Sequence, residues 1–95
     1  MTKEQFIDSV NNKKIPEFSS IYLETLWYAG IGNWDKAHEI IQDAPGKHAA
    51  LLHAHLHRVE GDQCNADYWY GNAGETSPNC SLDEEWKRLV EKFIS

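Results

Sequence analysis

The sequence has little positive charge. Nine Lys and Arg residues stand against 15 Asp and Glu residues, which gives a formal net charge of -6 at pH 7. The basic cluster at Lys13 and Lys14 is only two residues long. An acidic surface repels phosphate groups. We therefore expect no nucleic-acid partner and no docking on an anionic membrane.

Long hydrophobic runs are also missing. The polar start, Met1 to Gln5, is not followed by an apolar stretch, so we predict neither a signal peptide nor a membrane span. A cytoplasmic location follows as an expectation. Cys64 and Cys80 lack the spacing of a metal-binding or redox pair. In an unsecreted chain we predict them to be free thiols.

Catalytic signatures are absent as well. No segment has a glycine-rich phosphate loop or a nucleophile elbow, and none alternates like a strand between hairpin turns. What is present is an ordinary globular composition, 41% hydrophobic and 25% charged, with four Trp, four Tyr and three Phe for packing. We predict a single all-α domain over residues 1–95.

Helical periodicity predicts six short helices. Their start signals are a capping box at Thr2 and Gln5, N-caps at Asn33 and Asp62, and a second capping box at Ser81 and Glu84. The acidic run after Ser81 is explained by the helix dipole. Glycines and prolines supply the stops. The expected ranges are 2–10, 16 or 17–29, 34–44, 47–60, 63–73 and 82–93.

An internal repeat joins the middle helices. Each unit reads helix, glycine turn, helix, and three pairs of small residues align between the units: Gly32 with Gly61, Ala37 with Ala66, and Ala44 with Ala73. This pattern resembles the tetratricopeptide repeat over residues 18–78, although Gln63 stands where that family has an aromatic residue. The resemblance implies two antiparallel hairpins flanked by N- and C-terminal helices. A generic helical bundle with alanine at its contacts is the alternative.

A second resemblance lies in one block of sequence. The residues from His53 to Asp62 read His-Ala-His-Leu-His-Arg-Val-Glu-Gly-Asp, and Tyr68-Trp69-Tyr70 follows. This block resembles a family of small uncharacterised helical proteins. That family has a more basic pair where Gly71-Asn72 stands here. The resemblance supports the helical fold and implies no activity.

The repeat resemblance implies a binding surface. In such repeats the first helix of each hairpin lines a concave face, which here would carry Tyr22, Leu51, His55 and Arg58. Tyrosine and arginine commonly anchor partner peptides, and Arg58 suits an acidic or C-terminal carboxylate. We therefore predict a non-enzymatic interaction module that binds a protein, a peptide or a second copy of itself. Alternatively, Arg58 pairs with a local carboxylate such as Glu60.

The histidines suggest a second function. His53 and His57 are four residues apart and share one helix face, which Glu60 continues. These three side chains could bind zinc in a small metal-dependent or acid/base enzyme. The zincin motif is absent, because Ala54 follows His53 where that motif has glutamate.

A mononuclear site would need a further ligand that only folding can supply, from His38, Glu39 or Asp62. The competing interpretation needs no cofactor. The histidines would then be half-buried structural groups, hydrogen-bonded to Asn65, Asp62 or a tyrosine hydroxyl.

Overall fold

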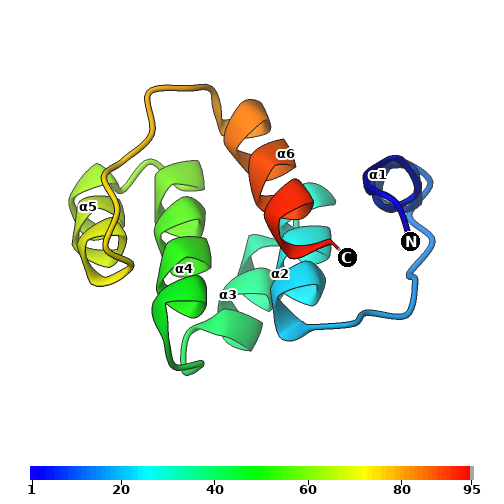
Figure 1. Cartoon of the computed structure of the whole chain (residues 1–95), viewed down its shortest axis with the longest axis horizontal. Coiled ribbons are helices and arrows are strands. Elements are labelled where there is room, and N and C mark those ends of the chain that lie inside the picture. The colour runs from blue at the N-terminus through cyan, green and yellow to red at the C-terminus, as the bar shows by residue number, and fades with distance from the viewer. Residues whose placement is uncertain (95) are drawn as a thin grey trace.

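The chain folds into six α-helices, and residues 1–94, the part described, contain no strand. In this computed structural model (Figure 1) the helices are α1 Lys3–Asn11, α2 Ile21–Gly30, α3 Trp34–Ile41, α4 Lys47–Val59, α5 Gln63–Asn72 and α6 Leu82–Phe93. The all-α prediction is confirmed. None of these helices has the length and apolar character needed to cross a bilayer.

The predicted N-caps form. Thr2 accepts a hydrogen bond from the Gln5 amide at 3.1 Å, and the Gln5 side chain accepts one from the Thr2 amide at 2.9 Å. Asn33 and Asp62 cap α3 and α5. Ser81 accepts from the Glu84 amide at 3.1 Å. These bonds satisfy amide groups that the first turn of a helix leaves without partners.

The predicted start of the second helix is wrong. We expected Pro16 or Glu17 to open it, whereas α2 begins at Ile21. Ser20 is the N-cap, and its hydroxyl accepts from the Leu23 amide at 3.2 Å. The preceding residues run without regular structure and carry Phe18 edge-on to Trp27, with ring centroids 6.2 Å apart. The third helix also ends earlier than expected, at Ile41.

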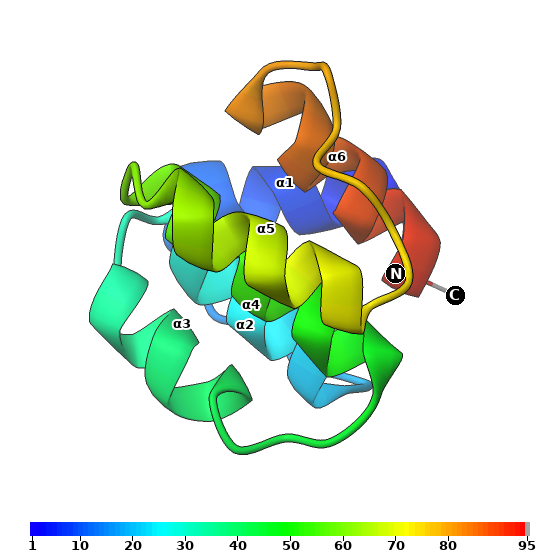
Figure 2. The same ribbon diagram turned by 90° about the vertical axis from the view of Figure 1, so that its left-hand side faces the viewer.

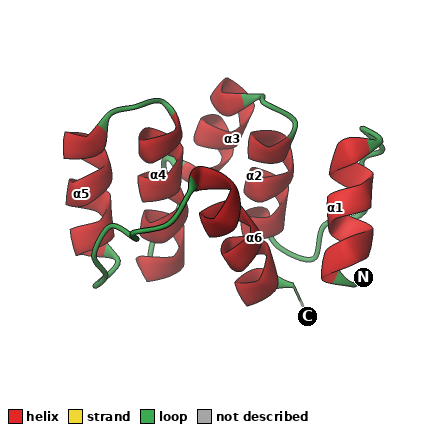
Figure 3. Ribbon diagram, turned by 90° about the horizontal axis from the view of Figure 1, so that it is seen from above, coloured by secondary structure: helices red, strands yellow, loops and turns green. Residues whose placement is uncertain are grey.

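The middle helices form two hairpins. α2 packs against α3 and α4 packs against α5, and Figure 3 shows these helices side by side in one row. The reversals fall at Gly32 and Gly61, whose φ angles of 86° and 87° favour glycine. Ala37 and Ala66 are fully buried, which lets the paired helices approach closely. The hairpins are present, and their tetratricopeptide character stays a prediction.

The last helix lies across the first helices of both hairpins. α6 contacts α2 and α4, and it lies on the opposite side of that pair from α3 (Figure 2). Its inner side buries Glu85, Leu89 and Val90. The Trp86 indole donates to the Leu26 carbonyl at 2.8 Å. Figure 1 shows α1 beyond α2, at the far end of the row from α5.

The close contact between Gly30 in α2 and Trp86 in α6 allows the position of α6 to be tested. A Cβ on Gly30 would lie 2.7 Å from Trp86 Cζ2 and 3.0 Å from Val10 Cγ1. We expect Gly30→Ala to destabilise the protein by about 1–3 kcal/mol through overpacking. Gly71→Ala in α5 is the control, because nothing lies within 4 Å of its Cβ, and it should stabilise the helix by up to about 1 kcal/mol. Urea unfolding measures both, and equal effects would contradict the packing of Trp86.

Candidate functional site

The expected concave face is covered by α6. Leu51 is 6% exposed and His55 is 2% exposed. The Arg58 side chain is 15% exposed. Tyr22 is half-buried, with its ring centroid 4.9 Å from that of Phe93 in α6. The residues predicted to line an open groove thus share one face of the hairpins, and the chain's own last helix occupies that face.

Glu85 is the centre of the contacts between α6 and the hairpins. Its Oε1 accepts from His55 Nδ1 at 2.6 Å and from Arg58 Nη1 at 3.0 Å, and its Oε2 accepts from the Tyr70 hydroxyl. Arg58 also donates to the Cys80 carbonyl. Arg58 therefore binds a carboxylate of the chain itself, as the alternative interpretation had it, but that carboxylate is Glu85 in α6 and not a local one such as Glu60 or Asp62.

These contacts set the ionisation of Glu85. Burial alone would raise the pKa of its carboxyl, but the hydrogen bonds from His55, Tyr70 and Arg58 outweigh burial and hold the pKa below its usual value. Burial and the Glu85 carboxylate together raise the pKa of the Tyr70 hydroxyl. Tyr70 therefore stays protonated and donates to Glu85.

A second cluster lies on another face of α4. One ring nitrogen from each of His38, His53 and His57 lies within 4.8 Å of the others. The Nε2 atoms of His38 and His53 are 3.1 Å apart. A tetrahedral zinc ion with Zn–N bonds of about 2.0–2.1 Å separates two of its nitrogen ligands by about 3.3 Å. Two of the three imidazoles therefore already have nearly the spacing that such an ion requires.

Tryptophan rings hold two of these imidazoles in place. Trp34 stacks on His38 with centroids 4.7 Å apart, and Trp69 stacks on His53 with centroids 4.0 Å apart. Trp34 is itself fixed, because its indole donates to the Leu56 carbonyl at 2.6 Å. The orientation of the two imidazoles is thus built into the packing of α3, α4 and α5.

The surroundings of His53 favour its neutral form. Burial, together with the neighbouring His57 and His38, lowers the pKa of His53 to about 4. His57 Nδ1 lies 2.6 Å from Glu60 Oε1. A carboxylate only accepts, so Nδ1 carries a proton and Nε2 is the ring nitrogen left for a metal ion. Carboxylates orient metal-binding histidines in this way.

The sequence located two of these three histidines. His53 and His57 are brought together as predicted, and the third nitrogen comes from His38, one of the candidates named for that position. Glu60 is bonded to His57 and lies outside the three-histidine cluster. It forms a second group with His57 and Asp62 within 4.8 Å.

In the group formed by His57, Glu60 and Asp62, the aspartate already accepts two hydrogen bonds. Asp62 accepts from the Asn65 amide at 3.2 Å and from the Asn65 side chain at 2.7 Å. The three-histidine cluster is therefore the better candidate for a metal site. The hydrogen-bond partners expected for structural histidines, namely Asn65, Asp62 or a tyrosine hydroxyl, are also not those found. His53 bonds to His38, and His57 bonds to Glu60.

Comparison with known proteins adds no relative. No family model, curated protein or solved structure matches this chain. The resemblances to the tetratricopeptide repeat and to the small helical family therefore stay predictions. The function must be argued from the geometry of the described residues.

The Glu85 contacts predict a dependence of stability on pH. The pKa of Glu85 in the folded protein lies below the ordinary value of 4.5. Its contribution is therefore complete above that value and is lost as the pH falls through the folded pKa. We expect Glu85→Gln to cost about 3 kcal/mol at neutral pH, with the gap to wild type closing in acid. Urea unfolding across that pH range measures the gap.

The control is Glu84→Gln, because Glu84 lies beside Glu85 in the sequence but its side chain is 62% exposed. It should change stability little at any pH. A Glu85→Gln gap that stays constant from neutral to acid pH would contradict the ionised, hydrogen-bonded state of Glu85.

Proposed function

We propose that this protein binds a transition-metal ion, with zinc as the first candidate, through His38, His53 and His57. The proposal rests mainly on one observation. The Nε2 atoms of His38 and His53 are 3.1 Å apart, and a His57 nitrogen lies within 4.8 Å of both. Without a metal ion, one of these two nitrogens donates a hydrogen bond to the other, whereas a bound cation would accept a lone pair from both.

The chemistry of the donors indicates the kind of metal. Three imidazole ligands suit zinc, copper or nickel, whereas magnesium and calcium prefer oxygen ligands. The low pKa of His53, about 4, keeps its nitrogen available at neutral pH. Glu60 then orients His57 and raises its basicity from the far side of the ring.

The number of ligands bears on the activity. Structural zinc sites are closed by four protein ligands, whereas catalytic sites have three and leave one position for water or substrate. Three histidines match the second pattern. A zinc ion bound there would act as a Lewis acid and lower the pKa of a bound water. We therefore favour a metal-dependent activity over a purely structural ion.

Zinc binding should be visible in the purified, untagged protein. We expect one zinc ion per chain and a thermal midpoint raised by about 10 °C at saturating zinc, because a ligand that binds only the folded state stabilises it. His38→Ala and His57→Ala should each reduce this shift strongly, because each variant keeps only two of the three imidazoles. His48→Ala is the matched control, since His48 is exposed and lies outside the cluster. Metal analysis and calorimetry provide the readouts.

Glu60→Gln distinguishes metal binding from a structural role for the histidines. This change keeps the side chain's shape and removes the carboxylate, so zinc affinity should fall about 10- to 100-fold. Equal zinc affinity in wild type and His57→Ala would overturn the proposal. So would a protein that contains no zinc and gains no stability from it.

The covered concave face supports a second candidate function, the interaction module predicted from the sequence. This second function is supported by the contact between Glu85 Oε1 and Arg58 Nη1, which are 3.0 Å apart. An amphipathic helix that carries a carboxylate already occupies the face. We propose that α6 of a second copy competes for the same position.

A labelled peptide of residues 81–94 tests this exchange on the intact chain. We expect saturable binding, which the same peptide with Glu85→Gln should lose by about tenfold or more, because hydrogen bonds to a buried charge are worth more than 1.4 kcal/mol. Fluorescence anisotropy measures both peptides. Equal binding of the two, or none, would contradict exchange at this face.

A further inference from the structure

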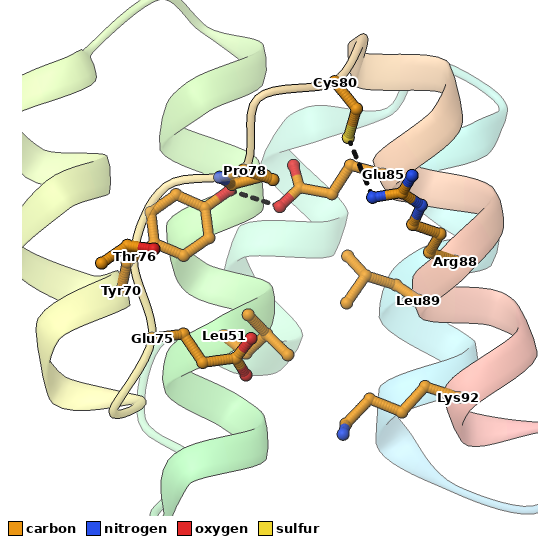
Figure 4. Close-up of a pocket in the computed structure, with 10 residues that line it drawn as sticks. All are labelled: Leu51, Tyr70, Glu75, Thr76, Pro78, Cys80, Glu85, Arg88, Leu89 and Lys92. Carbon is orange, nitrogen blue, oxygen red and sulfur yellow. Dashed lines mark hydrogen bonds between the residues drawn. The ribbon is translucent and has the colours of Figure 1, made fainter.

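A small cavity opens between α6, the segment that connects α5 to α6, and the side of α4 (Figure 4). Its volume is about 190 Å³, which equals the share of roughly six water molecules in the liquid. That is smaller than the usual site for a drug-sized ligand. None of the histidines of the candidate metal site lines it.

The floor of the cavity is apolar. Leu51 from α4 and Leu89 from α6 are buried there, and Pro78 from the connecting segment closes one side. Figure 4 shows Leu51 at the back and Leu89 projecting from α6 toward it. A ligand that fits this space needs an apolar group to replace water on these side chains.

The rim of the cavity carries charges of both signs. Lys92 and Arg88 project from α6, and Glu75 projects toward α6 from the segment that connects α5 to α6 (Figure 4). Among residues 1–94, Lys92 and Glu75 make no ion pair. Arg88 lies 4.0 Å from Glu84 and 3.7 Å from Cys80 Sγ, so both contacts are loose. All three side chains are exposed.

Glu85 also lines the cavity, but its carboxylate is already engaged. It accepts hydrogen bonds from His55, Arg58 and Tyr70. A ligand therefore has one available carboxylate, Glu75, and two available cations, Lys92 and Arg88. Opposite charges at the rim above an apolar floor favour a molecule that carries both charges next to an apolar group.

We propose that this cavity binds a small zwitterion with an apolar body, a free α-amino acid of about the size of leucine. The ligand carboxylate pairs with Lys92, its ammonium group pairs with Glu75, and its side chain packs on Leu51 and Leu89. Charge-assisted hydrogen bonds of this kind are the strong ones. This site is independent of the proposed metal ion.

Amide NMR of the intact protein, titrated with L-leucine, tests the proposal. The matched probes are 4-methylpentanoate, which lacks the ammonium group, and 3-methylbutylamine, which lacks the carboxylate. We expect saturable shifts at residues lining the cavity, with leucine binding about tenfold or more tighter than either analogue, since a charged hydrogen bond contributes more than 1.4 kcal/mol. Equal affinities for the three probes, or no saturation by leucine, would overturn the proposal.

Two variants test which charged side chain binds which end of the ligand. Lys92→Met should weaken leucine about tenfold and leave 3-methylbutylamine unchanged, whereas Glu75→Gln should weaken leucine and leave 4-methylpentanoate unchanged. Lys87→Met is the control, because Lys87 lies on the same helix, pairs with Asp83 at 3.0 Å and does not line the cavity. A loss of affinity in Lys87→Met as large as that in Lys92→Met would contradict the assignment.

Discussion

The buried carboxylate of Glu85 is the interaction on which the arrangement of the helices depends. It joins α6 to α4 through His55 and Arg58, and to α5 through Tyr70. A buried carboxylate is costly unless it is fully hydrogen-bonded. α6 can therefore lie across the hairpins only where all three donors meet it. This requirement makes the position of α6 specific, which hydrophobic packing alone would leave less defined.

Helix α4 separates the histidine cluster from the contacts around Glu85. It contacts α2, α3, α5 and α6, so most of its circumference is buried. His53 and His57 face α3 and α5, and His55 faces α6. Residues four apart share a helix face and residues two apart do not. The alternating histidines of one short segment therefore serve two environments, a histidine cluster with metal-site spacing and the hydrogen bonds to the buried Glu85 carboxylate.

Local signals in the sequence predicted much of the fold. The N-caps at Thr2, Asn33, Asp62 and Ser81 are confirmed, because a cap depends on residues within one turn. The start of α2 was wrong, since proline at 16 and the serine cap at 20 both suit a helix start and the packing of Phe18 decided between them. The two hairpins were predicted from small residues repeated at their contacts.

The sites depended on distant contacts, which sequence patterns do not report. Glu85 was explained by the helix dipole, but its role comes from donors on α4 and α5. His38 was one of three candidates for the third ligand, and only the packing of α3 on α4 selects it. The one local signal is Trp34, which lies one turn before His38 and stacks on its ring. Burial of the concave face was also unpredictable, because it depends on where α6 lies.

The central claim is that three imidazoles from α3 and α4 converge on one metal ion. X-ray absorption spectroscopy at the zinc edge of the zinc-loaded protein tests it most directly. We expect only nitrogen and oxygen scatterers at about 2.0–2.1 Å, with outer-shell scattering from three imidazoles that falls to two in His38→Ala. A sulfur scatterer at about 2.3 Å, or a spectrum unchanged by His38→Ala, would contradict it.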